Sequence, residues 1–168
     1  MIHMITGGER SGKSSYAQQL ALEASNVPIY FATAKVWDNE FKERIRRHKT
    51  ERDQRWQLIE SEIEIFRCLP ESGRTVVIDC ITLWLTNLFS FHKSDKRQAF
   101  DEAKQEVNQL SAYPGNLFVV TNEIGMGVHA PHSTTRDFVE LQGWTNQHLG
   151  KNADKVTLMV SGIPMTVK

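Results

Sequence analysis

The chain is short of cysteine, has no long hydrophobic run and carries no excess of charge of either sign. Its two cysteines, Cys68 and Cys80, form no C-x-x-C pair, which excludes a disulfide-rich scaffold and a structural zinc site and favours a reducing, cytoplasmic setting. Its longest apolar runs, such as residues 117–120, are far too short to cross a bilayer, so we expect no membrane insertion. Twenty Lys and Arg balance twenty Asp and Glu, and therefore no net field favours nucleic acid as a partner.

What the sequence does contain is a series of short apolar segments separated by helix-length amphipathic stretches. The expected strands cover residues 2–6, 28–33, 75–79, 117–121, 155–160 and 163–167. Unalternated runs are typical of parallel strands covered by helices on both faces, and Ser161 with Gly162 predicts a final hairpin with one antiparallel edge strand. We predict one α/β domain over residues 1–168, with a mostly parallel sheet in three α/β/α layers.

Two helix boundaries can be placed in the second half of the chain. Asp95 is positioned to cap a helix that ends near Ala112. Thr134 and Asp137 form a capping-box pattern for a second helix, which we expect to end near Gly150.

The strongest motif is a phosphate-binding turn of the P-loop type. The pattern G-x-x-x-x-G-K-S follows the first expected strand and precedes a helix pattern, and it comprises Gly7, Gly8, Glu9, Arg10, Ser11, Gly12, Lys13 and Ser14. Glycines let backbone N–H groups surround phosphate oxygens, the lysine reaches the β- and γ-phosphates, and the serine hydroxyl ligates Mg²⁺. The alternative is an ordinary glycine-rich turn without a ligand.

A second metal ligand is expected at the end of another buried strand. Asp79 closes the run at residues 75–79, where a metal-facing carboxylate of a P-loop enzyme stands. We predict that Ser14 and Asp79 hold Mg²⁺. The alternative is that Asp79 caps the following helix.

Residues 38–56 form a locally basic stretch that contains a histidine. If this stretch is helical, Phe41, Ile45, His48 and Arg52 share one face. His48 is then either a partly buried structural residue or, kept neutral by nearby cations, a nucleophile toward phosphorus. A nucleic-acid patch is disfavoured because acidic residues are interleaved with the basic ones.

Motifs along the whole chain resemble those of one known family. Besides T-G-G-x-R-S-G-K-S at residues 6–14, they are A-T at 32–33, R-I-x-x-H-K at 44–49, W-x-x-x-E at 56–60, D-C-I-T at 79–82, T-N at 86–87, T-N-E-I-G-M-G at 121–127 and V-S-G-I at 160–163. Many nucleotide-binding enzymes share the first pattern, but R-I-x-x-H and T-N-E-x-G-M-G are far more specific. The sequence resembles the bifunctional adenosylcobinamide kinase and adenosylcobinamide-phosphate guanylyltransferase family of cobalamin assembly.

The resemblance implies a P-loop NTPase-like fold, two reactions and a homotrimer. ATP or GTP phosphorylates the hydroxyl of adenosylcobinamide, and GMP is then transferred from GTP to that phosphate, giving adenosylcobinamide-GDP. The covalent guanylyl-histidine of the family carries over to His48. The implied nucleotide contacts are the residues of the phosphate-binding turn together with Ala32, Thr33, Ala34, Lys49, Thr50, Glu51, Arg52, Glu60 and Asp79.

Two other functions could use the same turn. One is a simple P-loop kinase of a small metabolite, in which His48 is structural. The other is a GTPase switch, which is disfavoured because the chain contains neither N-K-x-D nor D-x-x-G.

Three further polar residues have open roles. Glu123 follows a strand at the expected nucleotide edge and is either a base for the acceptor hydroxyl or a local hydrogen-bond acceptor for the loop at residues 125–127. His129 and His132 are either a metal-binding pair or part of a solvated loop, and the latter is favoured because no further ligands stand at a recognisable spacing.

Overall fold

A seven-stranded sheet forms the centre of the structure, a computed structural model in which residues 1–35 and 53–168 are described. The strands are β1 (Ile2–Gly7), β2 (Ile29–Ala32), β3 (Gln57–Glu60), β4 (Thr75–Asp79), β5 (Asn116–Val120), β6 (Lys155–Val160) and β7 (Ile163–Thr166). They lie in the order β3-β2-β4-β5-β1-β6-β7, and every neighbouring pair is parallel except β6 and β7. The predicted mostly parallel sheet with an antiparallel edge strand is confirmed.

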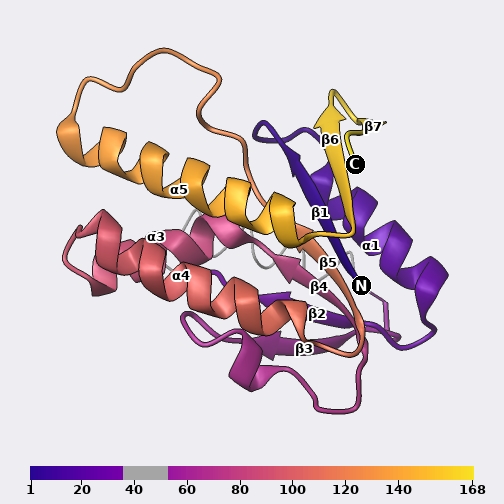
Figure 1. The fold of residues 1–168 in the computed structure, drawn as a ribbon. Coiled ribbons are helices and arrows are strands. Elements are labelled where there is room, and N and C mark those ends of the chain that lie inside the picture. Colours follow the sequence, from indigo (N-terminus) through magenta and orange to yellow (C-terminus); the bar gives the residue numbers. More distant parts are fainter. Residues whose placement is uncertain (36–52) are drawn as a thin grey trace.

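Helices cover both faces of this sheet (Figure 1). α1 (Lys13–Ala24) packs on one face, whereas α3 (Ile81–Phe91), α4 (Lys96–Ser111) and α5 (Ser133–Asn152) pack on the other, with the short 3-10 helix η1 (Phe66–Cys68) beside α4. Of the helices described, none is both long and apolar enough to cross a membrane. The predicted α/β/α layering is confirmed.

The strands build two cores, one on each side of the sheet. On β1, Ile2 and Met4 join the core under α3, α4 and α5, while Ile5 joins Ala17 and Ala21 of α1 on the opposite side. Burial on both sides removes the need for polar residues at alternate positions, which explains why these strands are unbroken apolar runs in the sequence.

The sequence pattern does not predict the edge strand β3. Leu58 of this strand is 44% exposed and its end residues are polar, so β3 lacks the apolar run that marks the central strands. The basic stretch at residues 38–56, considered above as a possible helix, lies mostly outside the described residues. The described end of this stretch, residues 53–56, forms a turn in which the N–H of Trp56 donates to the carbonyl of Asp53 at 3.3 Å.

One predicted helix cap is confirmed and the other is wrong. Asp95 accepts hydrogen bonds from the N–H groups of Arg97 and Gln98 at the start of α4. By contrast, α5 begins at Ser133, with His132 at the N-cap position, so Thr134 lies inside the helix; its end at Asn152 is near the predicted end at Gly150. Thr134 and Asp137 cannot form a capping box because both lie inside the helix, and the Asp137 carboxylate pairs with Lys96 of α4 at 2.6 Å.

Candidate functional site

The turn between β1 and α1 has the geometry of a phosphate-binding loop. Gly12 precedes α1 with a φ of 91°, a left-handed conformation that glycine adopts without strain. Lys13 is only 6% exposed, and its ammonium donates to the backbone oxygen of Gly8 at 2.5 Å and to Ser11 Oγ at 3.4 Å. The cation is therefore held over the turn, beside the helix N-terminus, where an anion is stabilised.

Segments from distant parts of the sequence hold this turn in place. The N–H of Glu123 donates to the carbonyl of Gly7 at 3.0 Å, and the N–H of Gly162 donates to the carbonyl of Ser11 at 3.1 Å. Gly7 has a φ of 149°, and a Cβ at this position would lie 2.5 Å from the backbone oxygen of Met159. Only glycine allows β6 to approach the turn so closely.

Asp79 lies at the carboxyl end of β4, on the same side of the sheet as α1. Its Oδ2 accepts a hydrogen bond from the hydroxyl of Tyr30 at 2.7 Å, which orients the carboxylate. α3 begins at Ile81 with no side-chain cap hydrogen bond from the described residues, so the alternative of Asp79 as a helix cap is wrong. The sequence does not predict the role of Tyr30. A hydroxyl group in an otherwise apolar buried strand needs a hydrogen-bond partner, and that was the one indication that the sequence offered.

The donor set fits Mg²⁺. The Ser14 hydroxyl in the first turn of α1 and the Asp79 carboxylate supply the hard oxygen ligands that this ion prefers, and Mg²⁺ usually binds few protein groups and completes its shell with water and phosphate oxygens. Magnesium binding by these two residues remains a prediction.

The other predicted contacts at the sheet edge lie on neighbouring strands. Ala32 at the end of β2 is in register with Glu60 of β3 and with Asp79 of β4. Three strands, β5, β4 and β2, separate β1 from β3, which sets the phosphate turn and Glu60 about 19 Å apart at about 4.8 Å per strand. A nucleotide with its phosphates in the turn could extend along this edge, past Asp79, toward Glu60.

Thr33 occupies this edge but its side chain faces inward. The residue is fully buried, and its hydroxyl donates to the carbonyl of Cys80 at 2.8 Å and accepts from the N–H of Cys80 at 2.9 Å. These bonds tie the end of β2 to the start of α3. The contact of Thr33 and of the neighbouring Ala34 with nucleotide remains a prediction.

The predicted catalytic histidine cannot be placed in this geometry. His48 lies outside the described residues, and so do the four predicted nucleotide contacts that follow it, Lys49, Thr50, Glu51 and Arg52. Their roles remain predictions.

The residues with open roles have mostly local functions. Glu123 Oε1 accepts a hydrogen bond from the N–H of Gly125 at 2.8 Å. This contact agrees with the interpretation of Glu123 as a local acceptor for the loop at residues 125–127. Burial raises the pKa of the Cys80 thiol to about 12, as for a small core residue. His129 and His132 are exposed, and no group of three or more potential metal-ligating side chains forms in the part of the chain described, in agreement with a solvated loop.

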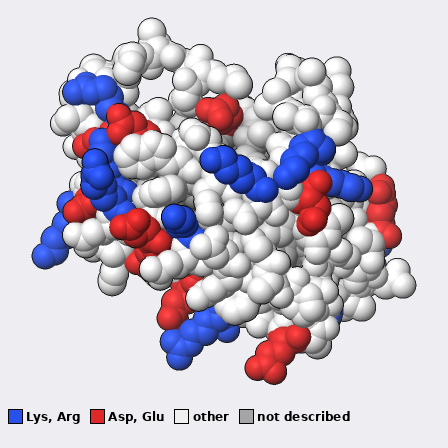
Figure 2. All heavy atoms as spheres, viewed as in Figure 1, with Lys and Arg blue, Asp and Glu red and all other residues white. Residues whose placement is uncertain are grey.

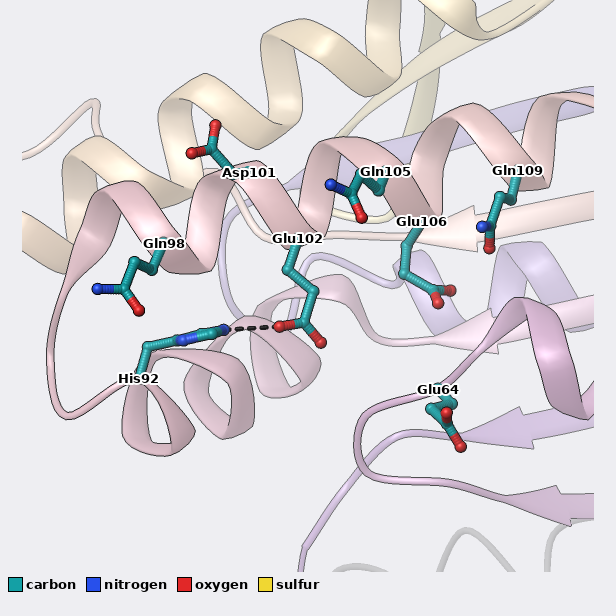
Figure 3. Close-up of a pocket in the computed structure, with 8 residues that line it drawn as sticks. All are labelled: Glu64, His92, Gln98, Asp101, Glu102, Gln105, Glu106 and Gln109. Carbon is teal, nitrogen blue, oxygen red and sulfur yellow. Dashed lines mark hydrogen bonds and ion pairs between the residues drawn. The ribbon is translucent and has the colours of Figure 1, made fainter.

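A cavity of about 470 Å³ opens elsewhere, beside α4 (Figure 3). Its wall carries four carboxylates, from Glu64, Asp101, Glu102 and Glu106, and His92 Nε2 lies 2.6 Å from Glu102 Oε2. Burial raises the pKa of Glu106, while its carboxylate accepts from the N–H of Phe66 at 2.9 Å. These negative groups would repel a triphosphate, so this cavity does not compete with the glycine turn as the nucleotide site.

Comparison with known proteins gives the family of the chain. Residues 3–167 match the family described as cobinamide kinase / cobinamide phosphate guanyltransferase. The bifunctional adenosylcobalamin biosynthesis protein CobP of Pseudomonas aeruginosa is 36% identical over 171 residues, covering 100% of this chain and 98% of that protein. The bifunctional adenosylcobalamin biosynthesis proteins CobU of Escherichia coli and Salmonella typhimurium are 34% and 32% identical over 182 residues, covering 100% of each chain.

Among solved structures, the flagellar accessory protein FlaH from Methanocaldococcus jannaschii has a TM-score of 0.46 at 14% identity, covering 99% of this chain and 77% of that one, a likeness too distant to bear on function. The sequence relatives are much closer, and they match from end to end. The chain belongs to the cobinamide kinase / cobinamide phosphate guanyltransferase family.

Proposed function

We propose that this enzyme phosphorylates the hydroxyl of adenosylcobinamide with a nucleoside triphosphate and then transfers GMP from GTP to the new phosphate, releasing pyrophosphate and forming adenosylcobinamide-GDP. The observation that carries the proposal is the buried ammonium of Lys13 over the glycine turn, 2.5 Å from the carbonyl of Gly8. Membership of the family supplies the acceptor. A homotrimer is part of the same proposal, and light scattering of the purified protein tests it.

For the kinase step, the turn binds the triphosphate and the acceptor oxygen attacks the γ-phosphorus in line. The bond to the β-phosphate oxygen breaks, the nucleoside diphosphate leaves, and the hydroxyl proton passes to solvent. Lys13 and the N–H groups at the start of α1 neutralise the charge that develops on the phosphoryl oxygens. Ser14 and Asp79 would hold Mg²⁺, and the bound ion would supply positive charge that offsets the charge developing on the phosphoryl oxygens. Tyr30 keeps the Asp79 carboxylate oriented through its 2.7 Å hydrogen bond.

For the guanylyl step, His48 acts as the nucleophile. A ring nitrogen attacks the α-phosphorus of GTP, the bond to the β-phosphate oxygen breaks, and pyrophosphate leaves. An oxygen of the cobinamide phosphate then attacks the same phosphorus, and the P–N bond breaks to restore the imidazole. Basic residues beside His48 in the sequence, among them Arg47, Lys49 and Arg52, support this role because cations keep the ring neutral and bind phosphate.

The test is covalent labelling with GTP that carries radioactive phosphorus at the α-position. We expect label on the unaltered protein that is lost in acid and kept in alkali, as for a phosphoramidate. We expect none on His48→Ala, which should keep the kinase rate with ATP within about threefold because the histidine acts only on the α-phosphorus. His148→Ala is a matched control, because this histidine lies on α5 and contacts Asn108 instead.

Other outcomes separate the alternatives. An active kinase without label indicates a simple P-loop kinase. Label that persists on His48→Ala, or equal loss of both activities in that variant, contradicts the role of His48.

A further inference from the structure

The loop between β5 and α5 exposes apolar side chains beside the phosphate-binding turn. Met126 is 81% exposed and Val128 is 100% exposed. No Asp, Glu, Lys or Arg occurs from Ile124 to Thr135. Figure 2 shows the top edge of the molecule, where the loop lies in Figure 1, as white except for a blue side chain at its left end, whereas charges of both signs are scattered over the body below. Covering these apolar side chains with an apolar ligand would be favourable, because it removes their surface from water.

Both ends of this loop are fixed. At its start, Glu123 is bonded to Gly7 of the phosphate-binding turn, and the N–H of Asn122 donates to Thr82 Oγ1 at 2.9 Å. At its end, the guanidinium of Arg136 donates to the carbonyls of Ala130 and Pro131 at 3.0 and 2.8 Å. The loop that carries the exposed residues is therefore anchored at both ends, and its first residues are bonded to the phosphate-binding turn.

A buried polar network on α5 adds to this anchoring. Asn146 Nδ2 donates to the carbonyl of Asn122 at 3.0 Å, while its Oδ1 accepts from Thr121 Oγ1 at 2.7 Å and from Gln142 Nε2 at 3.0 Å. Gln142 is 1% exposed and Asn146 is 9% exposed. Polar side chains at core positions of a helix have a cost that their hydrogen bonds must offset, and here those bonds define where the loop begins.

We infer that this loop is the surface on which the corrin ring of the cobinamide acceptor rests, with Met126 and Val128 against the ring. The inference rests on the proposed function, which requires the side-arm hydroxyl of a large macrocycle to reach the γ-phosphate in the turn. A corrin ring carries methyl groups and uncharged amide arms, and a loop without ionised side chains matches this chemistry. Contact with these two residues keeps the ring at the rim of the turn while the hydroxyl-bearing arm extends inward.

The test compares two double variants that are matched in chemistry. Met126→Ser with Val128→Ser changes the loop, and Ile163→Ser with Met165→Ser changes exposed apolar residues on β7, which are 66% and 52% exposed. Equilibrium binding of the coloured adenosylcobinamide is measured by ultrafiltration and absorbance, which needs no turnover. Kinase kinetics are measured with adenosylcobinamide and with 1-amino-2-propanol, a small acceptor that lacks the ring.

We expect the loop variant to raise the Kd and the KM for adenosylcobinamide about tenfold. The KM for the triphosphate, the rate with the small acceptor and the melting temperature should stay unchanged, and the β7 variant should behave as the unaltered protein. Unchanged cobinamide binding by the loop variant, or a larger loss in the β7 variant, overturns the inference. Cobinamide binding that depends on the loop but is followed by no phosphorylation leaves the inference standing and contradicts the proposed function.

Discussion

At the scale of single residues, the ammonium of Lys13 is the group with the clearest chemical task. It is buried, it lies on backbone and hydroxyl oxygens of the glycine turn, and it opens a helix whose N-terminus already favours anions. A buried cation with these neighbours contributes little to stability but much to binding a triphosphate. Its removal should therefore separate activity from folding.

The Lys13→Met variant tests this separation. We expect kcat/KM to fall at least about 100-fold for both reactions because the transition-state charge loses its main partner. The melting temperature should fall little, since an apolar chain of similar length fills the same space. Steady-state kinetics and thermal unfolding measure the two effects, with Lys151→Met on α5 as the control. Full kinase activity in the variant would contradict the P-loop assignment.

The hydrogen bond from Tyr30 to Asp79 leads to a second prediction at this scale. In Tyr30→Phe, the carboxylate loses the donor that orients it, so we expect the Mg²⁺ concentration for half-maximal kinase activity to rise about tenfold. Titration of activity with Mg²⁺ gives this value. Tyr113→Phe, which removes a similar bond to the N–H of Arg74 at 2.8 Å, should change stability without shifting the Mg²⁺ curve. A shift in both variants would show that the effect is not specific to Asp79.

Residue identity alone predicts only part of this site. The glycine turn, Lys13 and Asp79 follow from a motif and a strand end, because both are local in sequence. The Tyr30 hydroxyl and the Thr33 hydroxyl act through partners on another strand and at the next helix start, and no local pattern encodes such pairs. Asn146 and Gln142 could have been noticed as polar residues on the buried face of a helix.

At the scale of elements, agreement between sequence and structure depends on burial. The strands β1, β4 and β5 lie between two helical layers and are predicted nearly to the residue. The edge strand β3 is missed because most of its side chains are exposed, so it needs no run of apolar residues that a sequence pattern could detect. The start of α5 is misplaced because the pattern of Thr134 and Asp137 lies inside the helix and not at its cap. Asp137 forms a tertiary ion pair with Lys96, and a sequence pattern cannot distinguish that use of the carboxylate from a cap.

The cap of α4 provides the prediction for this scale. Replacing Asp95 with Ala leaves the N–H groups of Arg97 and Gln98 without their acceptor, so we expect a loss of about 1 kcal/mol in the free energy of unfolding. Urea denaturation measures it. Asp101→Ala, an exposed position within the same helix, should change stability by less than about 0.5 kcal/mol. Equal losses in the two variants would show that helix propensity or charge, and not the cap, sets the effect.

For the whole molecule, a buried histidine in the inner strand β1 couples folding to pH. His3 is 7% exposed, and its Nε2 lies 2.8 Å from Thr157 Oγ1 of β6. Burial, helped by the positive charge of Lys155, lowers the pKa of His3 below 6.5. Near pH 6.5 the unfolded chain therefore binds a proton at His3 more readily than the folded chain does. The free energy of unfolding falls as the pH decreases through 6.5.

We expect the free energy of unfolding to decrease between pH 7.5 and 5.5 by at most about 1.4 kcal/mol per pH unit from this residue. His148, whose pKa burial also lowers, acts in the same direction, while Glu106, whose pKa burial raises, acts in the opposite one. We therefore compare the pH dependence of the free energy of unfolding between the unaltered protein and His3→Gln. Glutamine keeps polar atoms at this position but does not titrate in this range. Urea denaturation of both proteins at several pH values gives this pH dependence, and parallel curves would exclude His3 as the source.

The glycine turn owes its shape to two backbone bonds, from Glu123 to Gly7 and from Gly162 to Ser11, that only a fully assembled chain can make. We therefore expect detachment of the final hairpin or of the loop after β5 to weaken triphosphate binding even where the rest of the sheet stays folded. Activity would then report on assembly of the complete chain, because binding at the turn depends on residues from both its middle and its end.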